Sequence, residues 1–310
     1  MSRQKTIREP IEIQGKGIHT GCTTTMRFLP APPNHGYAFC RIDLPGKPII
    51  KALAQNVFDT SRGTSIREGI AVVRTVEHVL AAVLGCDLDN IMIEINSEET
   101  PILDGSSAPF TNILQKAGIV EQDAIRITYN VQKKVYLKDN DKDVEMWLVP
   151  DDGYRISTMV DYDSKVLASQ NALLKSVGDF NSEFSKARTF VFLSEVEMLL
   201  QRKLIQGGDI KNAVVFVDRM LSQDELDHLA TVFNQPKVDV LKEGVLNNIE
   251  LYYPNEPARH KTLDVFGDLS LVGCRFTGHI IANKPGHKTN VEFARMIQNQ
   301  IQKTYGIEIA

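Results

Sequence analysis

The chain has 310 residues, of which 43% are hydrophobic and 24% charged, proportions typical of a folded globular protein. Its net charge of −4 at pH 7 argues against broad nucleic-acid binding, which needs a concentrated basic surface. No apolar run approaches the roughly 20 residues of a membrane span, and the polar residues 1–9 do not resemble a signal peptide, so we expect a cytoplasmic protein.

The N-terminal part of the chain is predicted to begin with strands. β-Branched residues favour strands over 10–14 and 23–28, on either side of the glycine-rich segment 15–21. A glycine-rich segment can bind phosphate, but that role requires a helix N-terminus directly after it. Strand-like threonines follow instead, so we predict a turn-rich connection.

The segment 75–84 is predicted to be a helix, with Thr75 as its N-cap, Glu77 in the first turn and Gly85 at its end. A strand with isoleucine at every second position follows it, and the next two elements are a turn and a short helix. These three elements cover residues 90–96, 101–105 and 110–117.

The pattern resets near residues 122–126, where a second series of strands begins. We predict strands over 125–129, 134–137 and 144–149, helices over 257–271 and 290–305, and a polar surface insertion over 235–253. Two strand-rich stretches, each followed by helices, indicate two α+β domains, 1–122 and 126–310. No internal repeat is evident, and the absence of a long Gly/Ser-rich linker favours domains that pack together.

The four cysteines give no indication of a metal or redox site. Cys22, Cys40, Cys86 and Cys274 are far apart and form no C-x-x-C motif. We therefore predict that they are small buried apolar residues. Any metal site would have to consist of His, Asp and Glu side chains.

Three polar residues at helical spacing are the first candidates for such a site. His260, Asp264 and Asp268 follow one another every four residues, so a helix would align them on one face. Apolar neighbours would partly bury this column, and buried carboxylates need a cation or a metal. Zinc binds His nitrogen and Asp oxygen, but the same spacing is also typical of an ordinary exposed ion pair.

Two further motifs have the same ambiguity. Glu77-His78 lies at the start of an apolar helix, where the pair could be a catalytic base beside a metal ligand. Alternatively, Glu77 stabilises the helix N-terminus and His78 is a hydrogen-bonded residue of the core. His287 precedes a predicted helix on a loop, where it is either a catalytic group or a surface histidine. His19 and His279 fit ordinary packing, and His35 and His228 fit exposure to solvent.

Several motifs in order along the chain resemble one zinc enzyme family, the UDP-3-O-acyl-N-acetylglucosamine deacetylases, which act in lipid A biosynthesis of Gram-negative bacteria. The motifs are Gly17-Ile18-His19-Thr20-Gly21, Thr75-Val76-Glu77-His78, Pro101-Ile102-Leu103-Asp104-Gly105, Ala187-Arg188-Thr189-Phe190, His260-Lys261-Thr262-Leu263-Asp264 and Gly286-His287. The segment 60–64 is more polar than in many members. Some members are fused to a C-terminal hydroxyacyl-carrier-protein dehydratase, and we expect residues 1–310 to be too few to include one.

The resemblance implies an α+β fold of two similar domains, in which helices pack between two outer sheets and a small βαβ insertion belongs to the second domain. It implies a catalytic zinc held by His78, His260 and Asp264, and these ligand types also accept Fe²⁺. The substrate would be a UDP-3-O-(3-hydroxyacyl)-N-acetylglucosamine, which loses acetate in the committed step of the pathway, and the enzyme would be a monomer.

The resemblance also implies a role for each remaining site residue. Glu77 would be the general base, His287 the general acid and Thr189 a stabiliser of the oxyanion, while Lys261 and Asp268 would support the site. Tyr162 would lie on the uridine side of the substrate. The segment 188–215 would form the passage for the acyl chain, lined by Phe190, Phe192, Val196, Ile205, Gly208, Ala213 and Val215.

Two other functions remain as alternatives. A non-catalytic nucleic-acid-binding module fits the size of the domains but not the net charge. A metal-dependent hydrolase of another amide would use the same ligands, and only substrate profiling separates it from the deacetylase.

Overall fold

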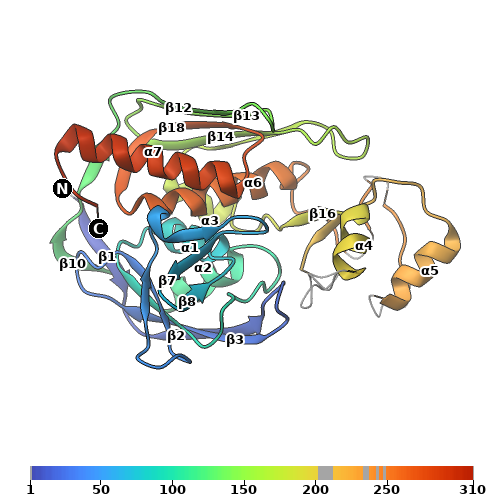
Figure 1. Cartoon of the computed structure of the whole chain (residues 1–310), viewed down its shortest axis with the longest axis horizontal. Coiled ribbons are helices and arrows are strands. Elements are labelled where there is room, and N and C mark those ends of the chain that lie inside the picture. The colour runs from blue at the N-terminus through green and yellow to red at the C-terminus, as the bar shows by residue number, and fades with distance from the viewer. Residues whose placement is uncertain (1, 202–211, 233–236, 242–243, 247–248, 310) are drawn as a thin grey trace.

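The computed structural model describes residues 2–201, 212–232, 237–241, 244–246 and 249–309. The first half of the chain folds around a five-stranded sheet with the order β2-β3-β9-β4-β5 (Figure 1). In this sheet β4 runs parallel to β9, and every other neighbouring pair is antiparallel. The strands are β2 (Ile11–Lys16), β3 (Thr23–Pro30), β4 (Tyr37–Arg41), β5 (Ile49–Lys51) and β9 (Ile91–Ile95).

Two smaller sheets accompany this one. One is antiparallel and contains β6 (Val57–Asp59), β7 (Ser65–Glu68) and β8 (Ala71–Val73). The other pairs β1 (Arg3–Ile7) with β10 (Ile119–Ile125), so the N-terminal strand is tied to the end of the first half.

The second half repeats the topology of the first. Its main sheet has the order β12-β13-β18-β14-β15, and the central strand β18 is again antiparallel to one neighbour and parallel to the other. These strands are β12 (Val135–Asp139), β13 (Val144–Val149), β14 (Tyr154–Val160), β15 (Gln170–Leu174) and β18 (Arg275–Asn283), and β11 (Thr128–Asn130) also pairs with β18. No repeat is evident in the sequence itself, but the two halves share one topology, as the family resemblance implies. The predicted boundary at 122–126 stays a prediction.

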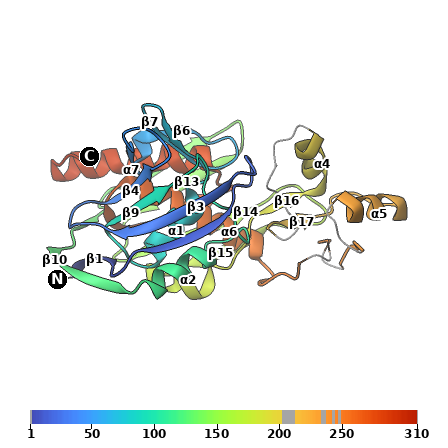
Figure 2. The ribbon, with the colours of Figure 1, turned by 90° about the horizontal axis from the view of Figure 1, so that it is seen from below.

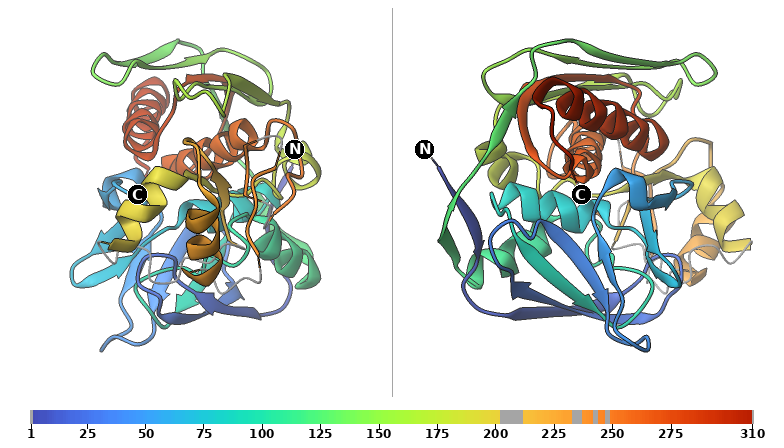
Figure 3. Two further views of the ribbon diagram at one scale, coloured as in Figure 1. Left: turned by 90° about the vertical axis from the view of Figure 1, so that its right-hand side faces the viewer. Right: turned by 60° about the vertical axis from the view of Figure 1, so that its left-hand side comes forward.

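Helices fill the space between the two main sheets, as Figure 1 and the right-hand view of Figure 3 show. α1 (Glu77–Gly85) packs against α6 (Glu256–Leu269), and α6 in turn packs on β14 and β15. α2 (Ala108–Lys116) contacts β2, and α7 (His287–Tyr305) contacts β12. The predicted fold class, α+β with helices between two outer sheets, is confirmed.

Burial explains why the apolar elements occupy the centre. Every residue of α1 is buried, because this mainly apolar helix touches protein on all sides. On β9 the side chains of Ile91, Ile93 and Ile95 are fully buried, as their alternation predicts. In the described part of the chain no helix is long and apolar enough to cross a membrane.

A small βαβ unit projects from the side of the second half (Figure 2). It consists of β16 (Phe190–Phe192), α4 (Leu193–Gln201) and β17 (Val214–Phe216), and the two strands are parallel. The predicted insertion is therefore present. α5 (Gln223–Val232) follows it, and the short helices η1 (Ala54–Asn56), η2 (Val177–Asp179), α3 (Phe180–Glu183) and η3 (Ser270–Val272) complete the described elements.

Three local predictions were wrong. Thr75 does not cap α1: Val76 holds the N-cap position, and Thr75 has a left-handed backbone with a φ of 58°. The last helix begins at His287 rather than Asn290, so His287 is its first residue and not part of a loop. The strand expected over 125–129 is divided, since β10 ends at Ile125 and β11 starts at Thr128.

Two burial predictions also need correction. Cys40 and Cys86 are buried, but Cys22 is exposed and Cys274 is partly exposed. The segment 235–253 is not a simple surface insertion, because its described part includes buried apolar side chains that pack near β16 and β17. These side chains are Val238, Val245, Leu246 and Ile249.

Candidate metal centre and active site

Three helices bring the candidate site residues together between the two main sheets. The start of α1 supplies Glu77 and His78, α6 supplies His260, Asp264 and Asp268, and the first residue of α7 is His287. Close contact between α1 and α6 depends on Gly267, since a Cβ there would lie 2.2 Å from the Glu77 carbonyl oxygen. Residues nearly 200 positions apart therefore share one buried cluster.

His78, His260 and Asp264 form a cluster suited to a metal ion. Their potential ligand atoms all lie within 4.8 Å of one another, and all three residues are buried. Oδ1 of Asp264 lies 3.4 Å from Nε2 of His260 and 3.8 Å from Nε2 of His78. Ligands of a tetrahedral zinc ion lie about 3.3 Å apart, because each bond is about 2.0 Å long.

The protonation of this cluster also fits a cation. Oδ1 of Asp264 is buried without a hydrogen-bond partner. Burial, reinforced by His260, lowers the pKa of His78 to about 3, and burial also lowers the pKa of His260. Both imidazoles are therefore neutral. Nδ1 of His260 donates to the Ala187 carbonyl at 2.9 Å, which leaves the lone pair of Nε2 facing Asp264.

Lys261 keeps Asp264 in its charged form. Its Nζ donates to Oδ2 of Asp264 at 2.8 Å, the oxygen that does not face the two histidines. Burial would raise the pKa of Asp264, but Lys261 and His260 outweigh it and lower that pKa. Burial would likewise lower the pKa of Lys261, and Asp264 raises it instead.

Glu77 lies beside the cluster and is held by the segment before β7. Its Oε2 accepts a hydrogen bond from the Thr64 backbone N–H at 2.9 Å, and a Cβ on Gly63 would lie 2.7 Å from its Oε1. Burial raises the pKa of Glu77 to about 7. A carboxyl group with this pKa can accept and release a proton near neutral pH.

His287 faces Glu77 across the site. Its Nδ1 donates to Oδ2 of Asp268 at 2.9 Å, while its Nε2 lies 3.9 Å from Oε1 of Glu77 and 4.0 Å from Oδ2 of Asp264. Burial alone would lower the pKa of His287, but Asp268 and Glu77 raise it to about 9. Between these two pKa values, the His287 imidazole is therefore mostly protonated while the Glu77 carboxyl is mostly ionised.

Thr64 and Asn290 belong to this network, although the sequence did not single them out. Thr64 Oγ1 donates to Oδ1 of Asp268 at 2.5 Å, and Asn290 Nδ2 donates to its Oδ2 at 2.9 Å. Neither residue type is diagnostic of chemistry. The one available signal was the unusual polarity of 60–64.

The other predicted residues lie at varying depth around the cluster. Thr189 is half-buried, and its backbone N–H donates to the Gly105 carbonyl at 2.8 Å. Phe190 connects the βαβ unit to the site, because its ring lies 6.4 Å from the His260 ring and 5.7 Å from the Lys261 ammonium. Tyr162 packs edge-on against Phe190 and Phe192.

The predicted passage residues divide between two apolar clusters. Val196 and Val215 lie in one cluster with Leu193 and Leu246, whereas Phe190 and Phe192 pack against the other. Ala213 is half-buried, and Ile205 and Gly208 lie outside the described residues. Of the described candidates, Phe190 and Phe192 are on the side nearer Tyr162.

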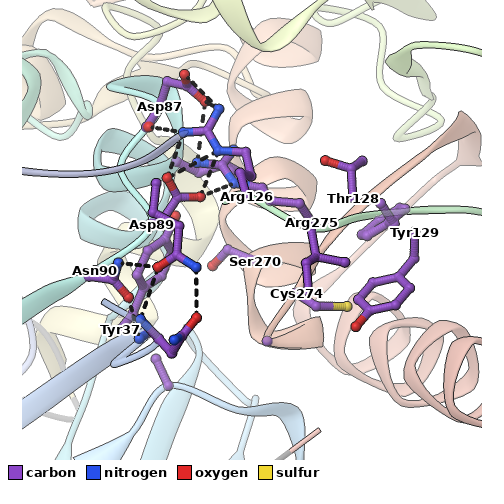
Figure 4. A pocket seen from close by; sticks show the side chains of 18 of the residues that line it. Tyr37, Asp87, Asp89, Asn90, Arg126, Thr128, Tyr129, Ser270, Cys274 and Arg275 are labelled. Atoms are coloured by element: carbon purple, nitrogen blue, oxygen red, sulfur yellow. Dashed lines mark hydrogen bonds and ion pairs between the residues drawn. The ribbon is translucent and has the colours of Figure 1, made fainter. Parts of the chain in front are cut away.

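A cavity of about 430 Å³ lies at the C-terminal ends of α1 and α6, beside Leu84 and Leu269, and none of the predicted site residues line it (Figure 4). One wall is an ion network in which Arg126 and Arg275 bind Asp87 and Asp89. Arg126 and Arg275 also donate to the carbonyls of Asp87 and Leu88, just beyond α1, so the network fixes the end of that helix.

Comparison with known proteins identifies relatives over nearly the whole chain. Residues 4–231 and 234–299 match the family model described as UDP-3-O-acyl N-acetylglycosamine deacetylase. A UDP-3-O-acyl-N-acetylglucosamine deacetylase of Myxococcus xanthus is 38% identical over 298 residues, covering 96% of this chain and 86% of the relative.

Larger relatives show the same similarity. The bifunctional enzymes LpxC/FabZ of Porphyromonas gingivalis and Chlorobaculum tepidum are each 43% identical, over 303 and 298 residues. The matches cover 98% and 95% of this chain but only 66% and 64% of those relatives. The chain thus spans just under two thirds of their length.

Proposed function

Because the chain belongs to the UDP-3-O-acyl N-acetylglycosamine deacetylases, a family of hydrolytic enzymes, we propose that it removes acetate from UDP-3-O-(3-hydroxyacyl)-N-acetylglucosamine, the committed step of lipid A biosynthesis. The observation that carries this proposal is the buried His78, His260 and Asp264 cluster, flanked by an acid-base pair. A metal-dependent amide hydrolase uses both features: the ion polarises the carbonyl, and the acid-base pair moves the protons.

Zinc is the metal we propose for the cluster, with Fe²⁺ as the alternative that the same ligands accept. His78, His260 and Asp264 would hold it, and the orphaned Oδ1 of Asp264 supports this assignment. When bound, the ion would polarise the amide carbonyl and lower the pKa of water in the site. Three protein ligands are typical of a catalytic rather than a structural zinc site.

Glu77 and His287 divide the movement of protons in this proposal. The Glu77 carboxylate takes a proton from the attacking water, whose oxygen bonds to the acetyl carbon. The C–N bond then breaks, and protonated His287 donates its Nε2 proton to the sugar amine as it leaves. The 3.9 Å between His287 Nε2 and Glu77 Oε1 leaves the two groups facing the same small volume.

The surrounding residues would position the substrate and the two proton-transfer groups. Asp268 orients His287 through Nδ1, and Lys261 orients Asp264. Thr189 would help to stabilise the oxyanion, and Tyr162 would face the uridine. The apolar side chains of the βαβ unit would receive the acyl chain, with Phe190 at the end nearer the site.

Acetate release together with metal content tests this function. Purified protein is expected to hold one zinc ion and to release acetate from the acylated UDP-sugar, far faster than from the same sugar without its acyl chain. Release that does not depend on the acyl chain or the uridine would favour a hydrolase of another amide. Binding to RNA that weakens with salt would favour the nucleic-acid alternative, against which the charge of −4 already argues. A monomeric state and a cytoplasmic location also remain predictions.

A further inference from the structure

A left-handed residue stands directly before the helix that carries Glu77 and His78. Thr75 has a φ of 58°, a conformation that β-branched side chains rarely adopt. Two residues later α1 begins, and its first two residues are Glu77 and His78. The direction in which the chain enters α1 therefore depends on a turn that threonine does not favour by itself.

Hydrogen bonds from residues 98–100 hold this turn. The Thr100 hydroxyl donates to the Thr75 carbonyl at 2.6 Å, and the Thr75 hydroxyl donates to Oε1 of Glu99 at 3.4 Å. The backbone of Arg74 bonds to both Glu98 and Thr100, which places the two segments side by side. Thr75 is thus held by a short hydrogen bond to its carbonyl and by a longer one from its hydroxyl.

Glu99 is a fully buried carboxyl group that the mechanism does not use. In the described part of the chain no ion pair joins it to a cation, and its partners are hydroxyl and backbone N–H groups. Besides Thr75, these donors are the backbone N–H of His19, and both the backbone N–H and the hydroxyl of Thr20, at 2.7–2.9 Å. A Cβ on Gly17 would lie 2.3 Å from Oε2 of Glu99, so a larger residue there would displace the Glu99 carboxylate.

The loop that Glu99 holds leads back to the site by a second route. Nε2 of His19 lies 3.2 Å from the carbonyl oxygen of Arg62. Two residues after Arg62, Thr64 hydrogen-bonds Glu77 through its backbone and Asp268 through its hydroxyl. One carboxyl group is therefore connected to Glu77 from both sides, through the Thr75 turn and through the segment 62–64.

We propose that Glu99 is a positioning residue of the active site, which fixes the left-handed turn at Thr75 and thereby the directions of Glu77 and His78. The proposal rests on the proposed deacetylase function. Glu99 touches neither the metal ligands nor the acid-base pair, so it acts only through Thr75 and the loop at 17–20. Burial of a carboxyl group without a counter-ion costs free energy unless hydrogen bonds replace those to water. Four donors supply these bonds, and all four belong to the Thr75 turn or to the loop at 17–20.

Glu99→Gln tests the proposal, because it preserves the shape of the side chain but replaces one of its two acceptor oxygens by an NH₂ group. That donor would face the hydroxyl and N–H donors that now bind Glu99. We expect kcat to fall at least about tenfold, KM to change less than about twofold, and Zn²⁺ affinity to fall about tenfold, as for residues that orient metal ligands. The matched control is Glu98→Gln, which makes the same substitution at the neighbouring residue. The Glu98 side chain is half exposed, and its Oε2 pairs with Nε of Arg74 at 3.5 Å.

A double variant separates positioning from a general structural role. Glycine adopts a left-handed backbone freely, so adding Thr75→Gly to Glu99→Gln should restore most of the lost kcat. Thr100→Val, which removes only the bond to the Thr75 carbonyl, should lower kcat in the same direction and serves if Glu99→Gln does not fold.

Each outcome decides the matter. A folded Glu99→Gln protein with wild-type kcat and Zn²⁺ affinity would overturn the proposal, and so would a loss of kcat that Thr75→Gly leaves unrelieved. If the wild-type chain released no acetate, the proposed function would fail. The Zn²⁺ affinities of Glu99→Gln and Glu98→Gln, measured by competition with a chelator, would still show whether Glu99 positions His78.

Discussion

Nδ1 of His287 donates a hydrogen bond to Oδ2 of Asp268 at 2.9 Å, across 19 residues of sequence and between two helices. Asp268 is fully buried and also accepts hydrogen bonds from Thr64 and Asn290. Its three donors therefore come from α7 and from the segment before β7. This arrangement fixes the ring of His287 so that Nε2 faces Glu77.

The first prediction concerns metal binding. His260→Ala is expected to lose stoichiometric zinc and deacetylase activity together, because it removes one of three ligands from a buried cluster. Metal content by atomic absorption and acetate release measure the two effects. His279→Ala, which alters a histidine bonded to Ser157 on the second sheet, is the control. Full activity in metal-free protein would contradict this prediction.

The second prediction concerns proton transfer. Glu77→Gln and His287→Ala should each lower kcat by about 10²-fold or more, while both proteins keep their zinc. Single-turnover acetate release and metal content measure the two quantities. The assignment of His287 as the acid fails if His287→Ala retains the wild-type rate.

The third prediction concerns pH. Activity needs Glu77 without its proton and His287 with its proton, so kcat/KM should rise through the pKa of Glu77 and fall through that of His287. These pKa values are about 7 and about 9, and a bound divalent cation would lower both. Asp268→Asn removes the charge that raises the pKa of His287, so the falling limb should move to lower pH. The exposed Asp152→Asn variant should leave the profile unchanged.

The fourth prediction concerns the contact between α1 and α6. Gly267→Ala places a Cβ 2.2 Å from the backbone oxygen of Glu77, so the helices must separate. Overpacking of this kind costs about 1–3 kcal/mol, and it should also weaken zinc binding, because the ligands are on both helices. Urea denaturation and zinc titration test this. Gly178→Ala is the control, since its nearest atom would be 3.6 Å away; equal stability of the two variants would refute the argument.

The fifth prediction concerns the acyl chain. Each buried methylene adds about 0.8 kcal/mol, so a chain of ten or more carbons would dominate affinity. Ala213→Trp should therefore reduce kcat/KM for the acylated substrate far more than for a short-chain analogue. Similar losses on both substrates would mean that the βαβ unit only forms a core.

The sequence by itself determined the local elements and the candidate residues. Alternation of Ile91, Ile93 and Ile95 identified a buried strand, and the spacing of His260, Asp264 and Asp268 aligned them on α6, because both patterns depend only on the periods of strand and helix. The spacing of the cysteines then limited any metal site to His, Asp and Glu side chains. None of this required knowledge of which segments meet.

The tertiary structure decided what those residues do together. Only the packing of α1 on α6 at Gly267 brings His78 to Asp264, and only the start of α7 turns His287 toward Glu77. Thr75, which as a threonine suggests a helix cap, instead has a left-handed backbone and makes hydrogen bonds with Glu99 and Thr100, about 25 residues away. Such contacts outweigh the local conformational preference of a residue. They join segments that are far apart in sequence, so a local sequence pattern cannot predict them.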